Sequence, residues 1–172
     1  TAIEVQADGK IVVAGTSDQD FFVIRYTSTG TRDTTFSSDG IHTFDLGSSS
    51  SDVLKGMKIQ SDGKIVVVGY GSGNWGVARL TPTGDMDTIF GGGDGITITD
   101  FGGGNDEAQD LAIASDGKIL VGGHTNASGT DFAVARYTQA GLLDTSFSSD
   151  GKATADFGSG KTDKAYAIGI AG

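Results

Sequence analysis

The sequence contains no cysteine, one proline and only two histidines among its 172 residues. Without cysteine, and with so few histidines, it lacks the ligands of the usual Cys/His metal sites, and it cannot form disulfides. No run of residues is long and apolar enough to insert into a membrane as a helix. Basic residues are also few: 12 Lys and Arg stand against 22 Asp and Glu, for a net charge of −10. This excess of negative charge argues against binding to nucleic acid or to an anionic membrane.

Glycine, by contrast, is abundant, with 29 residues, and much of it lies in an internal repeat. Three nine-residue segments are nearly identical: ADGKIVVAG at 7–15, SDGKIVVVG at 61–69 and SDGKILVGG at 115–123. Three eleven-residue segments that follow them align without gaps: DFFVIRYTSTG at 20–30, NWGVARLTPTG at 74–84 and DFAVARYTQAG at 131–141. A tandem repeat of this length determines the architecture of the chain.

Each unit is predicted to form four strands. Apolar residues alternate before each Asp-Gly, as Ile3 and Val5 do, which indicates a strand with one face buried more deeply. Asp-Gly then predicts a two-residue hairpin turn with positive φ at both central residues. The next segment, KIVVAG, is apolar on both faces and is expected to lie inside. Two further strands follow, FFVIRY and, after a long polar connection, IHTFDL.

Four antiparallel strands in about 40–50 residues, repeated in tandem, are typical of a β-propeller blade. A β-solenoid coil would be shorter and would lack the hairpin turns, and a β-sandwich would not repeat so closely. We therefore expect an all-β single repeat domain that is a half-propeller or a fragment. Its expected parts are blade 1 at about 1–50, blade 2 at about 51–104, blade 3 at about 105–161 and one extra inner strand at 164–172.

The repeat resembles a known family. The motifs DGKIVVAG at 8–15 and DFAVARYTQAGLLDTSFSSDGKATADFGSGKTD at 131–163 are similar to the delta-sixty repeat of bacterial proteins, and the match covers the whole chain. This resemblance implies a propeller-like module of a large secreted or surface protein, and hence an extracellular or cell-surface location. The blade also resembles the kelch blade, whose second strand likewise ends in Gly-Gly. By that resemblance the strand before Asp-Gly-Lys is the innermost one.

Three blades are fewer than the four to eight of most closed propellers, and an open sheet edge tends to associate. We therefore expect the chain to belong to a longer repeat array or to associate with itself. Two copies of three blades would close a six-bladed ring. Both copies would then offer an inner strand for the same position, and an exchange of the extra strand between them would resolve this conflict.

Propeller topology places two sets of loops on one face, and loops on a rigid scaffold often carry function. They are the second-to-third-strand loops at 17–20, 71–74 and 125–131, and the blade-to-blade loops at 47–52, 102–107 and 158–163. The aligned residues Thr16, Tyr70 and His124 stand at the entrance of the first set and differ between units. With Asn74 and Asn126 they are the candidate contacts for a glycan or protein ligand. The other interpretation is that these positions vary because neither the fold nor a ligand constrains them.

Residues present in every unit are instead expected to be structural. Three arginines recur at aligned positions: Arg25, Arg79 and Arg136. Each is expected to bind a carboxylate or carbonyl in the long connection of its own blade, because the planar guanidinium satisfies several acceptors at once. Trp75 aligns with Phe21 and Phe132 and is expected in the core.

A small esterase-like hydrolase is the alternative function. The sequence lacks the Gly-x-Ser-x-Gly motif of a nucleophile elbow, which argues against this hypothesis. His124 is the candidate base, and Ser128 and Asp131 follow it in the same loop. Closeness in sequence does not establish the geometry of a catalytic triad, however. We therefore favour a non-catalytic binding or structural module.

The acidic loops allow two further hypotheses. Asp106, Glu107 and Asp110 could serve as the paired carboxylates of a glycosidase, although an exposed acidic loop is the simpler interpretation. Calcium is the one metal considered, with Asp18, Asp20, Asp106 and Asp110 as candidate oxygen ligands. Neither acidic stretch matches an EF-hand loop or the RTX nonapeptide, so no cofactor is expected.

Overall fold

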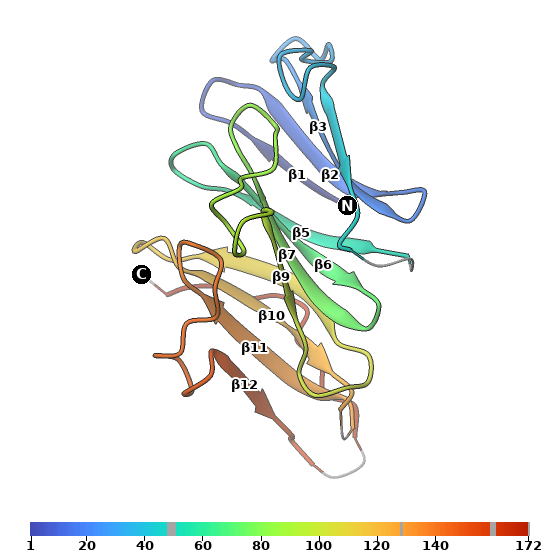
Figure 1. Cartoon of the computed structure of the whole chain (residues 1–172), viewed down its shortest axis with the longest axis vertical. Coiled ribbons are helices and arrows are strands. Elements are labelled where there is room, and N and C mark those ends of the chain that lie inside the picture. Colours follow the sequence, from blue (N-terminus) through green and yellow to red (C-terminus); the bar gives the residue numbers. More distant parts are fainter. Residues whose placement is uncertain (48–50, 128, 159–160, 172) are drawn as a thin grey trace.

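Every regular element of the protein is a β-strand in the computed structural model, which describes residues 1–47, 51–127, 129–158 and 161–171 (Figure 1). Within this part of the chain, twelve strands form three four-stranded antiparallel sheets, here called blades 1, 2 and 3. Blade 1 contains β1 (Ala2–Val5), β2 (Ile11–Ser17), β3 (Asp20–Tyr26) and β4 (Ile41–Phe44). Blade 2 contains β5 (Val53–Ile59), β6 (Ile65–Gly71), β7 (Asn74–Leu80) and β8 (Ile96–Thr99). Blade 3 contains β9 (Glu107–Ile113), β10 (Ile119–Thr125), β11 (Asp131–Tyr137) and β12 (Lys152–Ala155).

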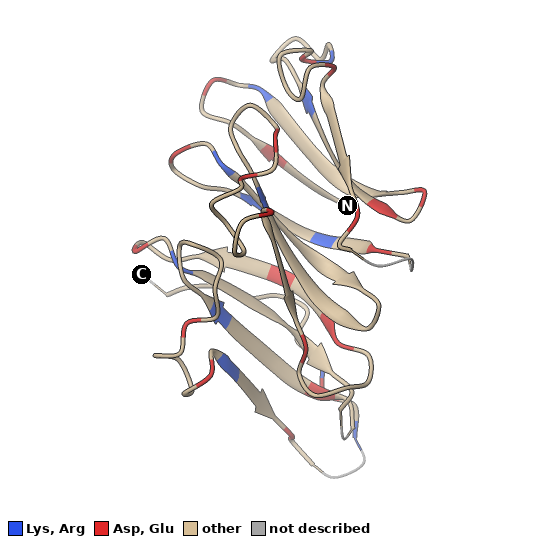
Figure 2. Ribbon diagram, in the orientation of Figure 1, with Lys and Arg blue, Asp and Glu red and all other residues tan. Residues whose placement is uncertain are grey.

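The blades stack face to face along the longest axis of the molecule, in the order of the sequence (Figure 1). The all-β architecture and the four-stranded antiparallel blades predicted from the repeat are confirmed. Acidic residues lie on loops of all three blades, with Lys and Arg among them (Figure 2). Among the described residues, no helix has the length and apolar character needed to cross a membrane.

Blade 2 lies between two hydrophobic clusters because its strand β6 is apolar on both faces. Val67 belongs to the cluster shared with blade 1, where Phe21 also lies. Its neighbours Val66 and Val68 belong to the cluster shared with blade 3, together with Leu111. The β6 valines are fully buried, and burying one such side chain contributes about 1.5–3 kcal/mol. The expectation that this segment lies inside is confirmed.

The Asp-Gly hairpins form, but their turns differ from the predicted two-residue type. In the first hairpin the N–H of Gln6 donates to the carbonyl of Lys10, and the N–H of Gly9 donates to that of Gln6, which leaves a three-residue loop. Only Gly9 takes a positive φ, of 82°, and Asp8 does not. The Asp8 carboxylate instead accepts the N–H of Lys10 at 3.1 Å. A turn that ends in a left-handed glycine also joins twisted strands, so the same dipeptide serves a longer loop.

The recurring arginines bind carboxylates of the long connection in their own blades, as predicted. In each case Nε donates to an aspartate Oδ2 at 2.8 Å: Arg25 to Asp33, Arg79 to Asp87 and Arg136 to Asp144. The Thr35 hydroxyl, with Lys10 and Arg25, holds the pKa of Asp33 well below its usual range. The aligned Ser146 hydroxyl has the same effect on the pKa of Asp144. These pairs anchor the long connection to the third strand of each blade.

The segment 161–171 runs behind blade 3 in Figure 1, close to its innermost strands. Thr162 forms a single parallel bridge with Thr130, and the N–H of Ala165 donates to the carbonyl of Gly123 at 3.3 Å. From Lys164 to the end of the described segment no residue is in a strand. The expected extra strand is therefore not formed in the described residues, because no second strand lies beside this segment to complete a ladder.

The arginine pairs predict a difference between the middle and the last blade. Arg79 is 5% exposed at its side chain, whereas Arg136 is 24% exposed. Asp87→Ala would leave a buried guanidinium without its carboxylate and is expected to lower the free energy of unfolding by about 3–5 kcal/mol. Asp144→Ala is the matched control and should cost less, because water reaches Arg136. Urea unfolding of both variants measures the difference, and equal losses would contradict this account.

Candidate functional site

The two sets of loops meet on one face of the blades, as propeller topology predicts. In each blade, the N–H of an aspartate at the end of the blade-to-blade loop donates to a hairpin carbonyl: Asp52 to Gln19 (2.7 Å), Asp106 to Gly73 (2.9 Å) and Asp163 to Thr130 (2.7 Å). The carboxylate of the same aspartate accepts a backbone N–H from the start of its loop at 2.8 Å: from Leu46, Phe101 and Phe157. These repeated bonds hold the loops together in one surface, here called the loop face.

A hollow of about 360 Å³ opens on the loop face between the β6–β7 hairpin and the loop that joins blades 2 and 3. Its lining combines one aromatic ring with polar and acidic groups: Ser51, Tyr70, Ser72, Gly73, Asn105, Asp106 and Glu107. Of these, Tyr70 and Glu107 are half-buried, while Ser51, Ser72 and Asn105 are exposed. A pocket with an aromatic surface and several hydrogen-bonding groups is typical of a site for a polar ligand.

Tyr70 is the largest side chain of this hollow. It is the penultimate residue of β6, where it pairs with Val53 on one side and Trp75 on the other. The ammonium group of Lys55 lies over its ring, 5.5 Å from the centroid. Burial and the nearby Glu107 carboxylate raise the pKa of Tyr70, so its hydroxyl keeps its proton and can donate a hydrogen bond at neutral pH.

His124, the candidate base, is 3% exposed and lies on β10 beside β9. Its Nε2 is 3.6 Å from the Glu107 carboxylate. Burial, with a contribution from Lys164, lowers the pKa of His124. A general base must touch its substrate, and a side chain so fully covered does not. Ser128, the nucleophile considered with it, lies outside the described residues, so no triad is assembled in this structure.

The other predicted ligand contacts have different surroundings. The hydroxyl of Thr16 accepts the N–H of Leu54 at 2.9 Å, so it joins blade 1 to blade 2. Asn74 begins β7 and pairs with Gly71 at the mouth of the hairpin. Asn126 is exposed, and its carbonyl packs against Gly104 of the adjoining loop. Of the aligned set at the loop entrance, only Tyr70 lines the hollow.

The acidic candidates for calcium are distributed differently from the prediction. Two aligned groups each bring three carboxylate oxygens within 4.8 Å of one another: Asp20, Asp45 and Asp52 at blade 1, and Asp131, Asp156 and Asp163 at blade 3. Asp106 holds the aligned position in blade 2, whereas Asp18 and Asp110 belong to neither group. Asp110 instead accepts the N–H of Ile168 at 3.0 Å. These groups offer oxygen donors of the type that calcium takes, and calcium stays the one metal considered.

Comparison with protein families identifies the repeat. The family described as "Domain of unknown function (DUF5122) beta-propeller" matches residues 6–36, 60–90 and 114–147. Each matched segment contains one Asp-Gly hairpin and one of the arginine–aspartate pairs. The chain belongs to the DUF5122 β-propeller family. The finer resemblance to the delta-sixty repeat stays a prediction.

The solved structures similar to this DUF5122 chain include a protein of unknown function from Bacteroides caccae. The TM-score is 0.51 and the sequence identity 14%, over 83% of this chain and 43% of that chain. At this identity the likeness shows the fold alone. No curated protein matches the sequence. The DUF5122 chain thus spans less than half of the structure that it resembles, and the comparisons assign the fold and the family.

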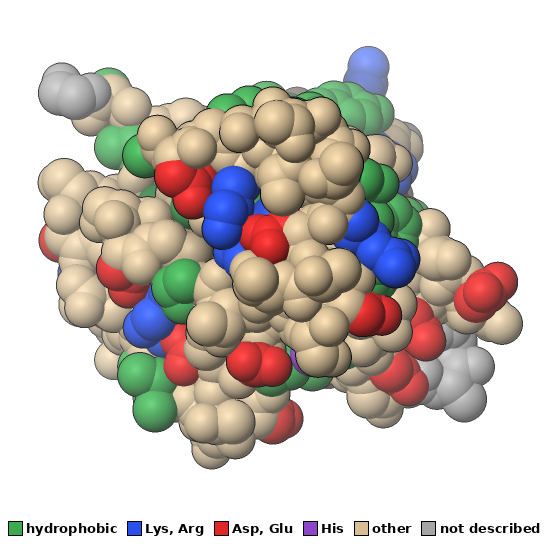
Figure 3. Space-filling view, turned by 90° about the horizontal axis from the view of Figure 1, so that it is seen from above, with side chains coloured by type: hydrophobic (Ala, Val, Ile, Leu, Met, Phe, Trp, Pro, Cys, Tyr) green, Lys and Arg blue, Asp and Glu red, His purple; other side chains and the backbone are tan. Residues whose placement is uncertain are grey.

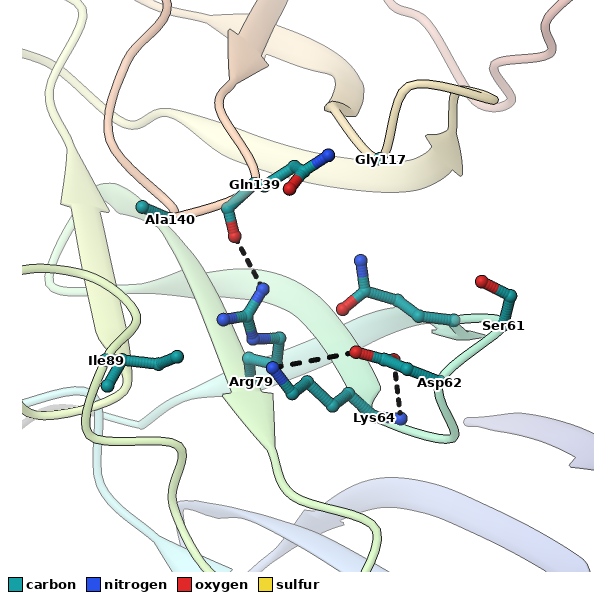
Figure 4. Close-up of a pocket in the computed structure, with 9 residues that line it drawn as sticks. Ser61, Asp62, Lys64, Arg79, Ile89, Gly117, Gln139 and Ala140 are labelled. Carbon is teal, nitrogen blue, oxygen red and sulfur yellow. Dashed lines mark hydrogen bonds and ion pairs between the residues drawn. The ribbon is translucent and has the colours of Figure 1, made fainter.

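A second pocket of the DUF5122 chain lies between blades 2 and 3 at the Asp-Gly-Lys hairpins (Figure 4). Arg79 and Lys64 point into it, and their charges are already used within the fold. Arg79 Nη1 donates to the Gln139 carbonyl at 2.6 Å, and Lys64 lies 3.3 Å from the Asp87 carboxylate. Because these residues belong to the repeated structure of every blade, the hollow at Tyr70 is the better candidate for a specific ligand.

Sequence reasoning missed part of that hollow. Ser51, Lys55 and Asn105 were not singled out, because they come from three different segments that only the packing of blades brings to Tyr70. Glu107 was considered only as a glycosidase carboxylate. The sequence did carry one signal for Glu107. Among the three aligned positions only this one holds an acid, whereas the other two hold Val53 and Lys164.

Burial of His124 predicts a pH dependence of stability. Its pKa in the folded chain lies below the ordinary 6.5, so the unfolded chain binds the proton more readily. The contribution of neutral, buried His124 to the free energy of unfolding is therefore fully present above pH 6.5 and is lost as the pH falls below this value. His124→Thr, which carries the blade 1 residue, should therefore lose less stability than the wild type between about pH 7 and pH 5. Denaturant unfolding across this range tests the prediction. His42 is common to both proteins and cancels, and identical pH profiles would refute the role of His124.

Proposed function

We propose that this chain is a non-catalytic binding module of a secreted or cell-surface protein, whose loop face holds a glycan in the hollow at Tyr70. The hollow itself carries the proposal, because it joins an aromatic ring to hydroxyl, amide and carboxylate groups, and neither Tyr70 nor Glu107 recurs at the aligned positions of the other blades. Sugars offer an apolar face for stacking and many hydroxyls for hydrogen bonds, which is the chemistry of this lining.

A protein is the other ligand considered, and the size of the hollow favours the glycan. About 360 Å³ suits a small ligand, whereas a specific protein partner needs a broad contact surface. The hydrolase hypothesis receives no support from the covered His124. The secreted or surface location rests on the resemblance of the repeat to modules of such proteins.

The proposal predicts that Tyr70→Ala weakens sugar binding. Wild-type protein is first screened on an array of mono- and oligosaccharides, and the best sugar is then titrated by calorimetry. Loss of ring stacking and of the hydroxyl should weaken binding roughly tenfold. Glu107→Gln keeps the shape of the lining and should weaken binding less.

Tyr166→Ala is the matched control, because Tyr166 is an exposed tyrosine that lines a different pocket, at blade 3. It should bind as the wild type does. Absence of sugar binding, or equal losses in Tyr70→Ala and Tyr166→Ala, would overturn the glycan proposal. If a protein ligand binds instead, and its binding is lost in Tyr70→Ala, the hollow would be a protein-binding site rather than a glycan-binding one.

A further inference from the structure

Each blade is joined to the next by an arginine that reaches out of its own sheet. Nη1 of Arg25 donates to the carbonyl of Pro82 in blade 2 at 2.7 Å. Nη1 of Arg79 donates to the carbonyl of Gln139 in blade 3 at 2.6 Å. Pro82 and Gln139 are aligned and lie in the turn after the third strand of the receiving blade. The same arginine therefore closes both junctions.

A phenylalanine and a backbone N–H complete the junction. Phe36 and Phe90 are fully buried against glycines of the receiving turn. A Cβ added to Gly84 would lie 2.8 Å from the Phe36 ring, and one added to Gly141 would lie 2.5 Å from the Phe90 ring. Beside them, the N–H of Ser37 donates to the Thr83 carbonyl at 2.7 Å, and that of Gly91 to the Ala140 carbonyl at 3.0 Å. The donating half of the junction thus supplies the arginine, the phenylalanine and the backbone N–H. The accepting half supplies the turn, with its two carbonyls and its glycine.

Blade 3 carries the complete donating half with nothing against it. Nη1 of Arg136 has no partner among the described residues, and neither has the N–H of Ser148, aligned with Ser37 and Gly91. Phe147 still lies under the guanidinium, 4.9 Å from its carbon, but it is half-exposed. Phe157 is 76% exposed, whereas the aligned Leu46 is buried between blades 1 and 2.

Blade 1 carries the accepting half, also uncovered. The turn at Ser28, Thr29 and Gly30 aligns with the receiving turns of blades 2 and 3, and all three residues are exposed. Nothing lies within 4 Å of a Cβ added to Gly30. Figure 3 looks onto this end of the molecule, where apolar side chains reach the surface. Among the described residues of β1, Ile3 is 66% exposed, whereas the aligned Met57 is 3% exposed beneath blade 1.

We propose that blade 3 of one copy docks onto blade 1 of a second copy through this junction. Arg136 would donate to the Ser28 carbonyl, Phe147 would pack under Gly30, and Ser148 would donate to the Thr29 carbonyl. The proposed contact would repeat the two junctions that the chain already forms, with the same hydrogen bonds and the same packing of a phenylalanine against a glycine. Because it joins unlike surfaces, it closes a ring or continues as an open chain. Two copies bring together six blades, within the range of closed propellers.

Docking requires an exchange at the inner edge. The segment 164–171 of one copy and β1 of the other align in sequence and claim the same place beside blade 3. Among the described residues, Ala165 and Ile168 tie this segment to blade 3 through backbone N–H groups. One of the two segments would therefore have to leave this position when the copies dock, and the junction at Arg136 and Phe147 is a separate contact.

Two single variants test the junction from its opposite ends. Gly30→Asn blocks the accepting half: Asn tolerates the φ of 84° and meets open space in the free chain. Phe147→Asp disables the donating half at a half-exposed position. Light scattering at about 0.15 M salt, which screens the net negative charge, should give the wild type a mass of at least twice 17.5 kDa. Each variant alone should give 17.5 kDa.

An equimolar mixture of the two variants keeps one intact junction and should form a 1:1 complex. Ile89→Asp adds the same charge at an exposed apolar residue away from both ends and should associate as the wild type does. Circular dichroism confirms that each variant is folded. A monomeric wild type, association unchanged in both variants, or a mixture that stays monomeric would overturn the proposal. A monomeric wild type would also assign these surfaces to further repeats of a longer chain.

Discussion

Face-to-face burial of neighbouring blades is the interaction on which the rest of this structure depends. Val66 and Val67 are consecutive on β6 and therefore point to opposite sides of one sheet, and each is buried only because a different blade covers it. A four-stranded sheet has no means of covering both of its own faces. Stability thus resides in the junctions between blades, and the loops take their positions from those junctions.

The sequence predicts most of what lies within a blade and little of what lies between blades. Period-two alternation and the Asp-Gly dipeptides identified four antiparallel strands, and the recurring Arg25 correctly implied a carboxylate partner in the long connection. The turn type was wrong, because a three-residue loop ending at Gly9 also satisfies the strand twist. The unpaired segment after blade 3 was expected as a strand, since its apolar alternation is the same whether or not a neighbour is present.

The candidate site shows the same limit. Thr16, Tyr70 and His124 are equivalent in sequence, yet one joins two blades, one lines a hollow and one is buried. Their surroundings differ because each meets a different residue of a neighbouring blade. Thr16 accepts the N–H of Leu54, Tyr70 shares the hollow with Glu107, and the carbonyl of His124 accepts the indole N–H of Trp75. Alignment of repeats locates the variable positions, and only the stacking of sheets decides which of them reaches solvent.

The arginine that links neighbouring blades binds a main-chain carbonyl, and this choice of acceptor has an evolutionary consequence. The residue at the accepting position is serine, proline or glutamine in the three units, and the bonds to the Pro82 and Gln139 carbonyls are 2.7 and 2.6 Å long. Because every residue supplies a carbonyl, mutation at this position leaves the junction intact. Units can therefore be duplicated, deleted or exchanged within a gene while each new pair of neighbours still fits, so the repeat number is free to change faster than the repeat itself.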